Sequence, residues 1–420
     1  MNATLGANRR ATTVCVVVAA LMGACGTQPR LGESAQPSPR CTASIDAVTN
    51  ARLADGRGVY VEARTVAYGG GRLLVLGERV LFDENGTVTR ASSDGQSVVG
   101  ILVDSDGRAT FVRAPPGDTS LVAPRALYQD DGRWTVIWIR VKQRVVSSLG
   151  AGTLVQATYD GRTWTEPAQV ASFDRVLLDA DLSRQVAELP RGFAFVQPIR
   201  QDSGKGDLAI IVSENGAWRR SDVPRSNGAL YSAVARVHGR WIVAYVGIDT
   251  AGTGLFAVRS TVDGQGWSVP TRLPANHGYS AAFLNLTDGL ALLTLGEASP
   301  FHPRGLFVLV SRDDGATWSS PASVVGADSA TAFATVILSS RLQVVLKQQG
   351  QSFRRTNVVG VVNEHSIRWL RSDSVDAIGT PSLARGDGDD ALVVWGAVDS
   401  TGSVPKPKLN IARYRLACSK

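Results

Sequence analysis

Two aspartates near the middle of the chain, Asp179 and Asp181, are candidates for acid and base chemistry. Residues two apart on a β-strand point to the same side of the sheet, so their carboxyl groups could act as a pair. Hydrolysis of a glycosidic bond uses two such acids roughly 5 to 10 Å apart. The same pattern is more typical of a solvated strand entry, so Asp181 is kept only as a candidate acid.

The histidines and the glycine-rich segments indicate no second chemistry. His238, His277, His302 and His365 lie far apart, without the spacing of metal ligands and without a cysteine as a partner. Residues 150–152 contain two glycines but do not open a helix, as a phosphate-binding loop would. We therefore expect no metal ion and no cofactor.

The first 24 residues have the pattern of a secretion signal. Arg9 and Arg10 precede an uncharged stretch that is too short to span a bilayer as a stable helix. Its end, Leu21-Met-Gly-Ala-Cys25, resembles the lipobox of bacterial lipoproteins, in which the cysteine thiol accepts diacylglycerol. The resemblance implies that residues 1–24 are a lipoprotein signal peptide and that Cys25 is the lipidation site. The alternative is a plain secretory signal that is cleaved nearby.

The next segment, residues 25–40, is rich in Pro, Ser, Gly and Gln and has one large apolar residue. Such a composition cannot bury a core, so we expect a flexible tether. Acyl chains on Cys25 would hold the protein on a membrane surface without a transmembrane helix. The expected location is therefore outside the cytoplasm, with a lipid anchor in the cell membrane or the outer membrane.

The remaining cysteines, Cys41 and Cys418, are placed to form a disulfide. Cys15 leaves with the signal peptide and Cys25 is acylated, so these two are the thiols left in an oxidising compartment. The bond would join the two ends of the folded part, residues 41–420. Because the enclosed loop is nearly the whole chain, the chain-entropy model gives a stabilisation on the order of 5 kcal/mol. The alternative is two unpaired thiols.

A turn that contains Asp-Gly and is followed by an aromatic residue recurs along the chain and must position any functional site. The aromatic residues are 49 to 54 positions apart, at Phe111, Trp164, Trp218, Trp267, Trp318 and Trp369. This period is the length of one four-stranded blade of a β-propeller. The sequence therefore predicts an all-β ring of repeated blades.

Seven short apolar runs, most of them after a Gly or Asp-Gly turn, favour seven blades, with six as the alternative if one weak repeat is an insertion. These runs are continuous rather than alternating, which is typical of strands buried on both faces. The expected blades are 55–117, 118–172, 173–225, 226–275, 276–326, 327–374 and 375–418. The last unit is short, so we expect a strand from Cys41 to Leu53 to complete it and to close the ring.

The most complete turn, Ser311-Arg-Asp-Asp-Gly-Ala-Thr-Trp318, matches the Asp-box pattern, Ser/Thr-x-Asp-x-Gly-x-Thr-Trp. By this motif the chain resembles sialidase-like, or BNR-repeat, propellers. In such a turn the Asp and Ser side chains bind turn amides, the Gly supplies a positive φ, and the Trp packs into the adjoining apolar layer. These roles are structural. The residues assigned to the boxes are Asp160, Gly161, Trp164, Ser260, Asp263, Gly264, Trp267, Ser311, Asp313, Gly315 and Trp318.

The resemblance to sialidases implies a central pocket with a cluster of arginines, a Tyr–Glu nucleophile pair and an acid/base Asp. Arginines suit an anionic sugar because guanidinium groups bind carboxylates in a bidentate manner. The nearest match to the Arg-Ile-Pro element of these enzymes is Pro124-Arg-Ala-Leu127, with Ala123 where the first arginine should stand. Arg125 could substitute for it, although a surface or channel-lining role is favoured. The catalytic candidates are Arg125, Asp181 and Tyr231.

The overall charge argues against nucleic acid as a partner. The formal net charge is +7, and no run of Lys or Arg exceeds two residues. We expect a monomer that binds a protein or glycan ligand on its propeller and carries out no covalent chemistry. The alternative is an enzyme, an exo-sialidase-like or other glycoside hydrolase with its pocket at the central axis.

Overall fold

The computed structural model of the 420-residue chain describes most of the residues that follow the expected tether. The described residues are 41–51, 59–82, 88–90, 98–112, 115–116, 122–141, 150–176, 186–189, 192–199, 208–214, 216–262, 264–275, 280–299, 302–350, 354–363, 366–399 and 406–418. Several predicted features lie outside them: the signal peptide, Cys25, the tether, the pair Asp179 and Asp181, and Asp263. No helix in the described part is long and apolar enough to cross a membrane.

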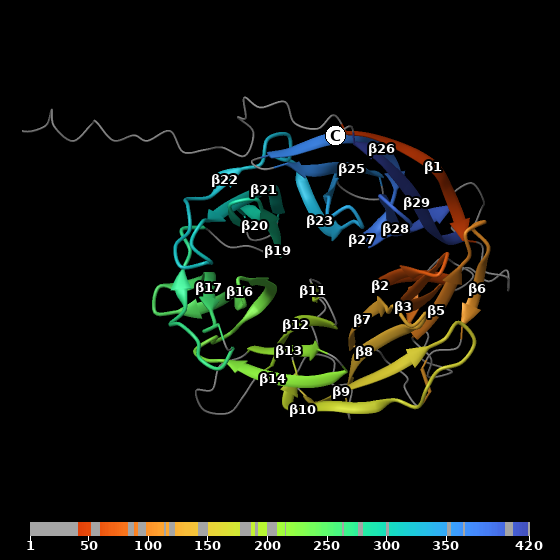
Figure 1. Ribbon diagram of the computed structural model, residues 1–420. Helices are drawn as coiled ribbons and strands as arrows, with labels where there is room; N and C mark the ends of the chain where they lie inside the picture. The colour runs from red at the N-terminus through yellow and green to blue at the C-terminus, as the bar shows by residue number, and fades with distance from the viewer. Residues whose placement is uncertain are drawn as a thin grey trace, which may run out of the picture.

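The described residues form seven antiparallel sheets arranged in a ring, a seven-bladed β-propeller (Figure 1). Blade 1 contains β2 (Val59–Gly69), β3 (Arg72–Phe82), β5 (Val98–Val103) and β6 (Ala109–Val112), with β4 (Val88–Arg90) paired to β3. Blade 2 contains β7 (Val122–Tyr128), β8 (Trp134–Val141), β9 (Gly150–Tyr159) and β10 (Ala168–Val176). Blade 3 contains β11 (Val186–Leu189), β12 (Gly192–Pro198), β13 (Leu208–Glu214) and β14 (Ala217–Val223).

The other four blades follow the same plan. Blade 4 contains β15 (Leu230–Val237), β16 (Arg240–Asp249), β17 (Gly252–Arg259) and β18 (Thr271–Arg272). Blade 5 contains β19 (Ala281–Leu286), β20 (Gly289–Ser299), β21 (His302–Ser311) and β22 (Ala322–Ser323). Blade 6 contains β23 (Ala330–Ile337), β24 (Gln343–Gln349), β25 (Arg354–Asn363) and β26 (Ser366–Asp376). Blade 7 contains β27 (Ile378–Arg385), β28 (Asp390–Asp399), β29 (Lys406–Cys418) and β1 (Cys41–Ala51).

Within each blade the first strand lies nearest the axis and the fourth lies at the rim (Figure 1). Because neighbouring strands are antiparallel, the turns between first and second strands lie on the same side of the ring as those between third and fourth strands. We call this side the terminal face, since β29 ends and β1 begins there. The loops between second and third strands, and those between blades, lie on the opposite face. The predictions of seven blades and of their approximate limits are confirmed.

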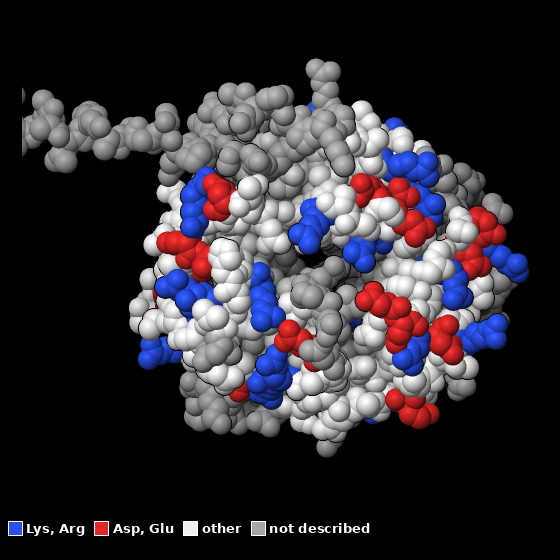
Figure 2. All heavy atoms as spheres, viewed as in Figure 1, with Lys and Arg blue, Asp and Glu red and all other residues white. Residues whose placement is uncertain are grey.

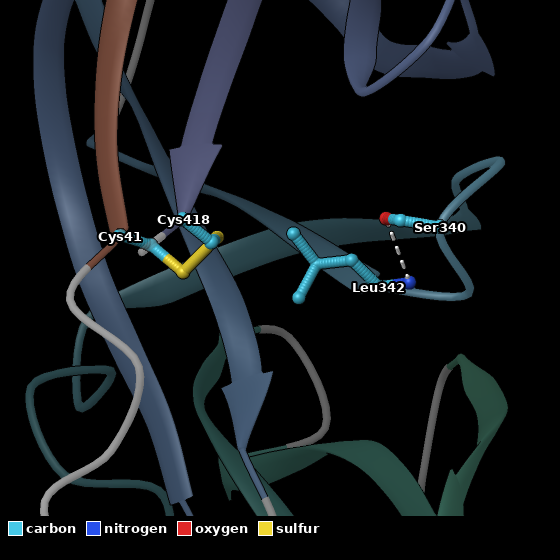
Figure 3. Close-up of a disulfide and its surroundings, with 4 residues drawn as sticks. All are labelled: Cys41, Ser340, Leu342 and Cys418. Atoms are coloured by element: carbon cyan, nitrogen blue, oxygen red, sulfur yellow. Dashed lines mark hydrogen bonds between the residues drawn. A yellow bond between two sulfur atoms is a disulfide. The ribbon is translucent and has the colours of Figure 1, made fainter. Parts of the chain in front are cut away.

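The N-terminal strand β1 closes the ring by pairing with β29 from Cys41↔Cys418 to Ala51↔Leu409. A disulfide joins the two cysteines at the first of these pairs (Figure 3). In blades 2 and 4 a tryptophan takes the same position at the end of the third strand. The two bridges there are Tyr159↔Trp164 and Ser260↔Trp267. Blade 7 has no turn there because its third and fourth strands, β29 and β1, are not consecutive in sequence. The disulfide therefore replaces the turn that links third and fourth strands elsewhere.

The buried apolar residues form one cluster at each interface between neighbouring blades. In six of these interfaces the cluster includes or contacts the aromatic residue of the repeat, namely Phe111, Trp164, Trp218, Trp267, Trp318 and Trp369. Each of these rings packs against the blade that precedes its own. At the seventh interface, between blades 6 and 7, buried Cys41 takes that place, and Leu342 packs against the same cluster (Figure 3).

Several repeat tryptophans also donate hydrogen bonds to the preceding blade. Trp218 Nε1 donates to Gln156 Oε1 at 2.8 Å, and Trp369 Nε1 donates to the carbonyl of Val325 at 2.8 Å. A buried indole N–H needs such a partner, because an unpaired donor would cost desolvation energy. The aromatic period in the sequence therefore reflects the joining of successive blades.

The turn that precedes Trp318 shows why the repeat contains Asp and Gly. Asp313 Oδ1 accepts hydrogen bonds from the amide of Thr317 at 2.9 Å and from the hydroxyl of Ser311 at 2.9 Å. Gly315 has φ of 78°, a region that favours glycine. Burial alone would raise the pKa of the Asp313 carboxyl, but the hydrogen bonds from Thr317 and Ser311 lower it below its usual value.

Removing the disulfide should weaken the ring at its point of closure. We expect the double variant Cys41→Ala, Cys418→Ala to lose about 2 to 5 kcal/mol of unfolding free energy, because the open chain regains loop entropy. Urea unfolding of the wild type with and without a thiol reductant provides the control: the reduced wild type should match the variant. An unfolding midpoint that stays the same in the variant and in the reduced wild type would show that the disulfide does not stabilise the fold.

Candidate functional site

The first strands surround the axis, so a central site would have to be built on them (Figure 1). Their buried side chains are mostly small, which lets the seven strands converge. Six of the seven blades contribute a buried alanine there: Ala63, Ala126, Ala233, Ala282, Ala332 and Ala384. Such a wall provides close packing rather than reactive groups.

Five of these first strands have a break in register against the second strand. The breaks lie between Ala63 and Thr65, Val122 and Arg125, Leu230 and Ala233, Ala330 and Ala332, and Ile378 and Ser382. A β-bulge turns the side chains that follow it away from the regular alternation. In blades 1, 2 and 7 the redirected side chains reach the neighbouring blade.

Three polar contacts join first strands to the next blade. Ser382 Oγ donates to the carbonyl of Ala63 at 3.2 Å, and the hydroxyl oxygen of Thr65 accepts from the amide of Ala126 at 3.0 Å. Arg125 Nη2 lies 3.5 Å from the carbonyl of Val196. These contacts link blades 7, 1, 2 and 3 in sequence around the axis.

Arg125, the candidate carboxylate-binding residue, is buried between blades 2 and 3. Only 4% of its surface is exposed, and its guanidinium carbon lies 4.4 Å from the centroid of the Phe195 ring. An arginine over an aromatic face gains a cation–π attraction that grows when water is excluded. The described contacts of Arg125 therefore join two blades.

Tyr231, another of the catalytic candidates, lies on β15 of blade 4 and has a φ of 46°, which is uncommon for an aromatic residue. Its ring is half-buried and packs against the cluster between blades 4 and 5. Arg125 and Tyr231 therefore belong to different interfaces, separated by blades 3 and 4. With Asp181 outside the described residues, the structure does not bring the three catalytic candidates together.

Charged side chains are few along the described part of the axis. Among the first-strand side chains that the structure describes, only Arg125, Arg236 and Arg385 are charged, and none is a carboxylate. Arg236 is exposed, pairs with Glu214 at 3.4 Å and lies 5.1 Å from the centroid of the Trp241 ring. Figure 2 shows a small hollow at the centre of the ring, with positive and negative side chains interspersed around it. No group of three or more potential metal ligands occurs in the described part.

Buried polar residues in blades 6 and 7 were missed by the sequence analysis. Lys347 is 3% exposed, donates to the carbonyl of Gly326 and lies 4.6 Å from the centroid of the Trp369 ring. Burial lowers the pKa of the Lys347 ammonium, and the charge of Asp328 partly offsets this effect. Gln348 and Asn357, whose side chains point to the other side of blade 6, are fully buried. The signal was present as polar residues that interrupt the apolar runs, but it resembles an ordinary strand end.

Comparisons with known proteins find distant structural similarity only. No family model and no curated protein matches the chain. Among solved structures, it is similar to a protein of unknown function from Dyadobacter fermentans, with 12% identity, a TM-score of 0.49 and coverage of 89% of this chain and 100% of that one. It is also similar to the NanB sialidase of Streptococcus pneumoniae, with 11% identity, a TM-score of 0.45 and coverage of 91% and 95%.

A third similar structure is the α-L-arabinofuranosidase PaAbf62A of Podospora anserina, with 13% identity, a TM-score of 0.37 and coverage of 89% and 96%. Similarities this distant carry no argument about ligands or activity. What the geometry defines is a class by architecture: a seven-bladed β-propeller closed by its N-terminal strand and a disulfide.

On the terminal face, Tyr68 at the end of the first strand of blade 1 donates a hydrogen bond to Asp387 of blade 7. Burial, together with the hydrogen bond and negative charge of Asp387, raises the pKa of the Tyr68 phenol from 10.0 to about 12. The contact therefore joins blade 1 to blade 7, which is the blade that the disulfide closes.

The raised pKa of Tyr68 predicts a loss of stability in alkali. Because the pKa is higher in the folded state, this contribution is fully present below pH 10 and is lost as pH rises through about 12. Tyr68→Phe should flatten the dependence of the urea unfolding midpoint on pH in this window. The pKa values of Tyr245 and Tyr414 are also raised by burial, and both residues remain in the variant as an internal control. Identical pH profiles for variant and wild type would refute the assignment.

Proposed function

We propose that this chain is an exported lipoprotein, held at the cell envelope by acylated Cys25, whose propeller binds a protein or glycan without covalent chemistry. The observation that carries the non-catalytic part is the wall of the axis. Its buried described side chains are mostly small, and the one charged residue among them, Arg125, contacts the neighbouring blade. A hydrolase pocket would need several convergent charged groups.

The position of Cys41 supports an orientation for binding. β1 begins at Cys41 on the terminal face, so the expected tether, residues 25–40, joins the propeller there. The opposite face bears the loops between second and third strands and the connections between blades. Loops on a rigid scaffold are common sites of recognition. We propose that the opposite face points away from the membrane and binds the partner.

The alternative hydrolase function requires Arg125, Asp181 and Tyr231 to converge on one substrate. The separation of Arg125 and Tyr231 into different interfaces weighs against it. The proposed partner is defined only by class, as a protein or a glycan. We also propose that the chain is a monomer, because each blade of the ring already has two neighbours.

Hydrolysis assays separate the two functions. Purified wild-type protein in detergent should show no turnover of a fluorogenic sialoside or of a panel of other aryl glycosides. Arg125→Ala should leave this baseline unchanged while lowering the unfolding free energy by about 1 to 3 kcal/mol, because a buried charged contact and its cation–π attraction are lost. Turnover that disappears in Arg125→Ala, with Arg125→Lys as a charge-matched control, would favour the hydrolase.

Anchoring is tested by substituting Cys25, the first residue of the expected tether. Cells that express the full chain and are labelled with a radioactive or clickable fatty acid should incorporate the label into the wild type and not into Cys25→Ala. Cys41→Ala is the matched control, since it removes a cysteine 16 positions later and should keep the label. Equal labelling of wild type and Cys25→Ala would exclude acylation at this site.

A further inference from the structure

Buried amide side chains gather at one of the seven interfaces, the one between blades 6 and 7. Gln348 on β24 and Asn357 on β25 are fully buried, and Asn410 on β29 is 6% exposed. At the same distance from the terminal face, the third strands of blades 2, 4 and 5 carry the apolar residues Leu154, Phe256 and Phe307. Asn357 is therefore a local departure from the repeat, whereas Gln348 has an equivalent in the buried Gln197 of blade 3.

The alternation of side chains places these amides on facing sides of the interface. Val344 and Leu346 of β24 belong to the cluster between blades 6 and 7, so Gln348 points the same way. Val359 and Val361 of β25 belong to this cluster too, which directs Asn357 toward blade 7. On β29 the same side is taken by Ala412, Tyr414 and Leu416, which directs Asn410 toward blade 6.

The amides also lie at nearly the same height above the terminal face. Asn357 pairs with Gln348, five residues beyond the first paired residue of β24, which is Gln343. Asn410 pairs with Trp395, four residues beyond Ala391, the first residue of β28 that is paired with β27. The difference of one residue corresponds to about 3.3 Å along a strand.

A chain of hydrogen bonds fixes how the amides of blade 6 are oriented. Arg355 Nη1 donates to Gln348 Oε1 at 2.5 Å, and Gln348 Nε2 donates to Asn357 Oδ1 at 3.0 Å. Since the guanidinium can only donate, Gln348 must present its oxygen to Arg355 and its amide nitrogen to Asn357. Asn357 must then direct its own Nδ2 donor away from Gln348.

This chain of donors ends without a partner, and an acceptor that also lacks one points into the same interface from blade 7. Asn357 Nδ2 is buried and has no hydrogen-bond partner among the described residues, and the same holds for Asn410 Oδ1. A buried donor and a buried acceptor that both lack partners are costly, and native proteins usually satisfy such groups with a bound molecule. The group required must accept from Asn357 and donate to Asn410.

We propose that the interface between blades 6 and 7 binds a hydroxyl group, which accepts a hydrogen bond from Asn357 Nδ2 and donates one to Asn410 Oδ1. A hydroxyl is the simplest group that does both. Its source is either an ordered water or a hydroxyl of a small neutral ligand such as a sugar. The site is separate from the axis and does not depend on the proposed function.

A crystal structure of the mature protein with ordered solvent tests the site directly. We expect one oxygen within hydrogen-bond distance of both Asn357 Nδ2 and Asn410 Oδ1. A direct Asn357–Asn410 hydrogen bond, or no atom between the two amides, would overturn the proposal. Because this experiment uses the wild-type sequence, it does not depend on whether a variant folds.

Thermal denaturation with neutral monosaccharides and glycerol identifies the source of the hydroxyl. A sugar ligand should raise the melting temperature of the wild type, and Asn410→Leu should abolish this rise. Thr294→Val is the matched control, because Thr294 is a buried polar residue of blade 5 whose hydroxyl already has a partner, and its variant should keep the response. A crystallographic oxygen without any sugar response would assign the site to water. A response that survives in Asn410→Leu, without that oxygen, would refute the proposal.

Discussion

The structure depends on one pairing that joins the two ends of the chain, β1 with β29. A propeller is a closed ring, so every blade needs a neighbour on both sides to bury its two apolar faces. Blade 7 has only three strands of its own in sequence, and β1 completes it from the other end of the chain. The cluster between blades 6 and 7 includes Cys41 of β1, so this pairing completes the last of the seven apolar clusters. The disulfide at the first pair of β1 and β29 holds the closure where the repeat elsewhere has a turn.

The fold could be predicted because the features that define it repeat. Asp313 accepts hydrogen bonds within its turn, and Trp318 packs between blades, so Asp, Gly and Trp recur at a fixed period in the sequence. Cys41 and Cys418 mark the register in which β1 pairs with β29. The site could not be predicted in the same way. Arg125 stands in a pattern similar to a catalytic element, yet a β-bulge directs it between blades, and a bulge leaves no reliable mark in sequence. The buried amides of blades 6 and 7 lie at the ends of apolar strands, where polar residues usually meet solvent.

The contrast between the axis and the interface of blades 6 and 7 matters for function. At the axis, small residues allow the strands to converge, and the polar contacts of Thr65, Arg125 and Ser382 are used to join blades. Between blades 6 and 7 the polar groups are buried, oriented by one another and incompletely paired among the described residues. Under the proposal, this propeller binds a hydroxyl group between two of its blades, at a location whose polar chemistry differs from that of its axis.

The position of the disulfide also decides how the protein bears mechanical load. Any pull on the segment before Cys41 is applied to the first pair of an edge strand, which would otherwise separate from β29 one hydrogen bond at a time, like a zip. The covalent bond transfers that pull directly to β29, which is held by β28 on one side and β1 on the other. Because β1 pairs only with β29, the ladder between β29 and β28 then resists the pull. A propeller built in this way can be held by its N-terminus without β1 being peeled from β29 first.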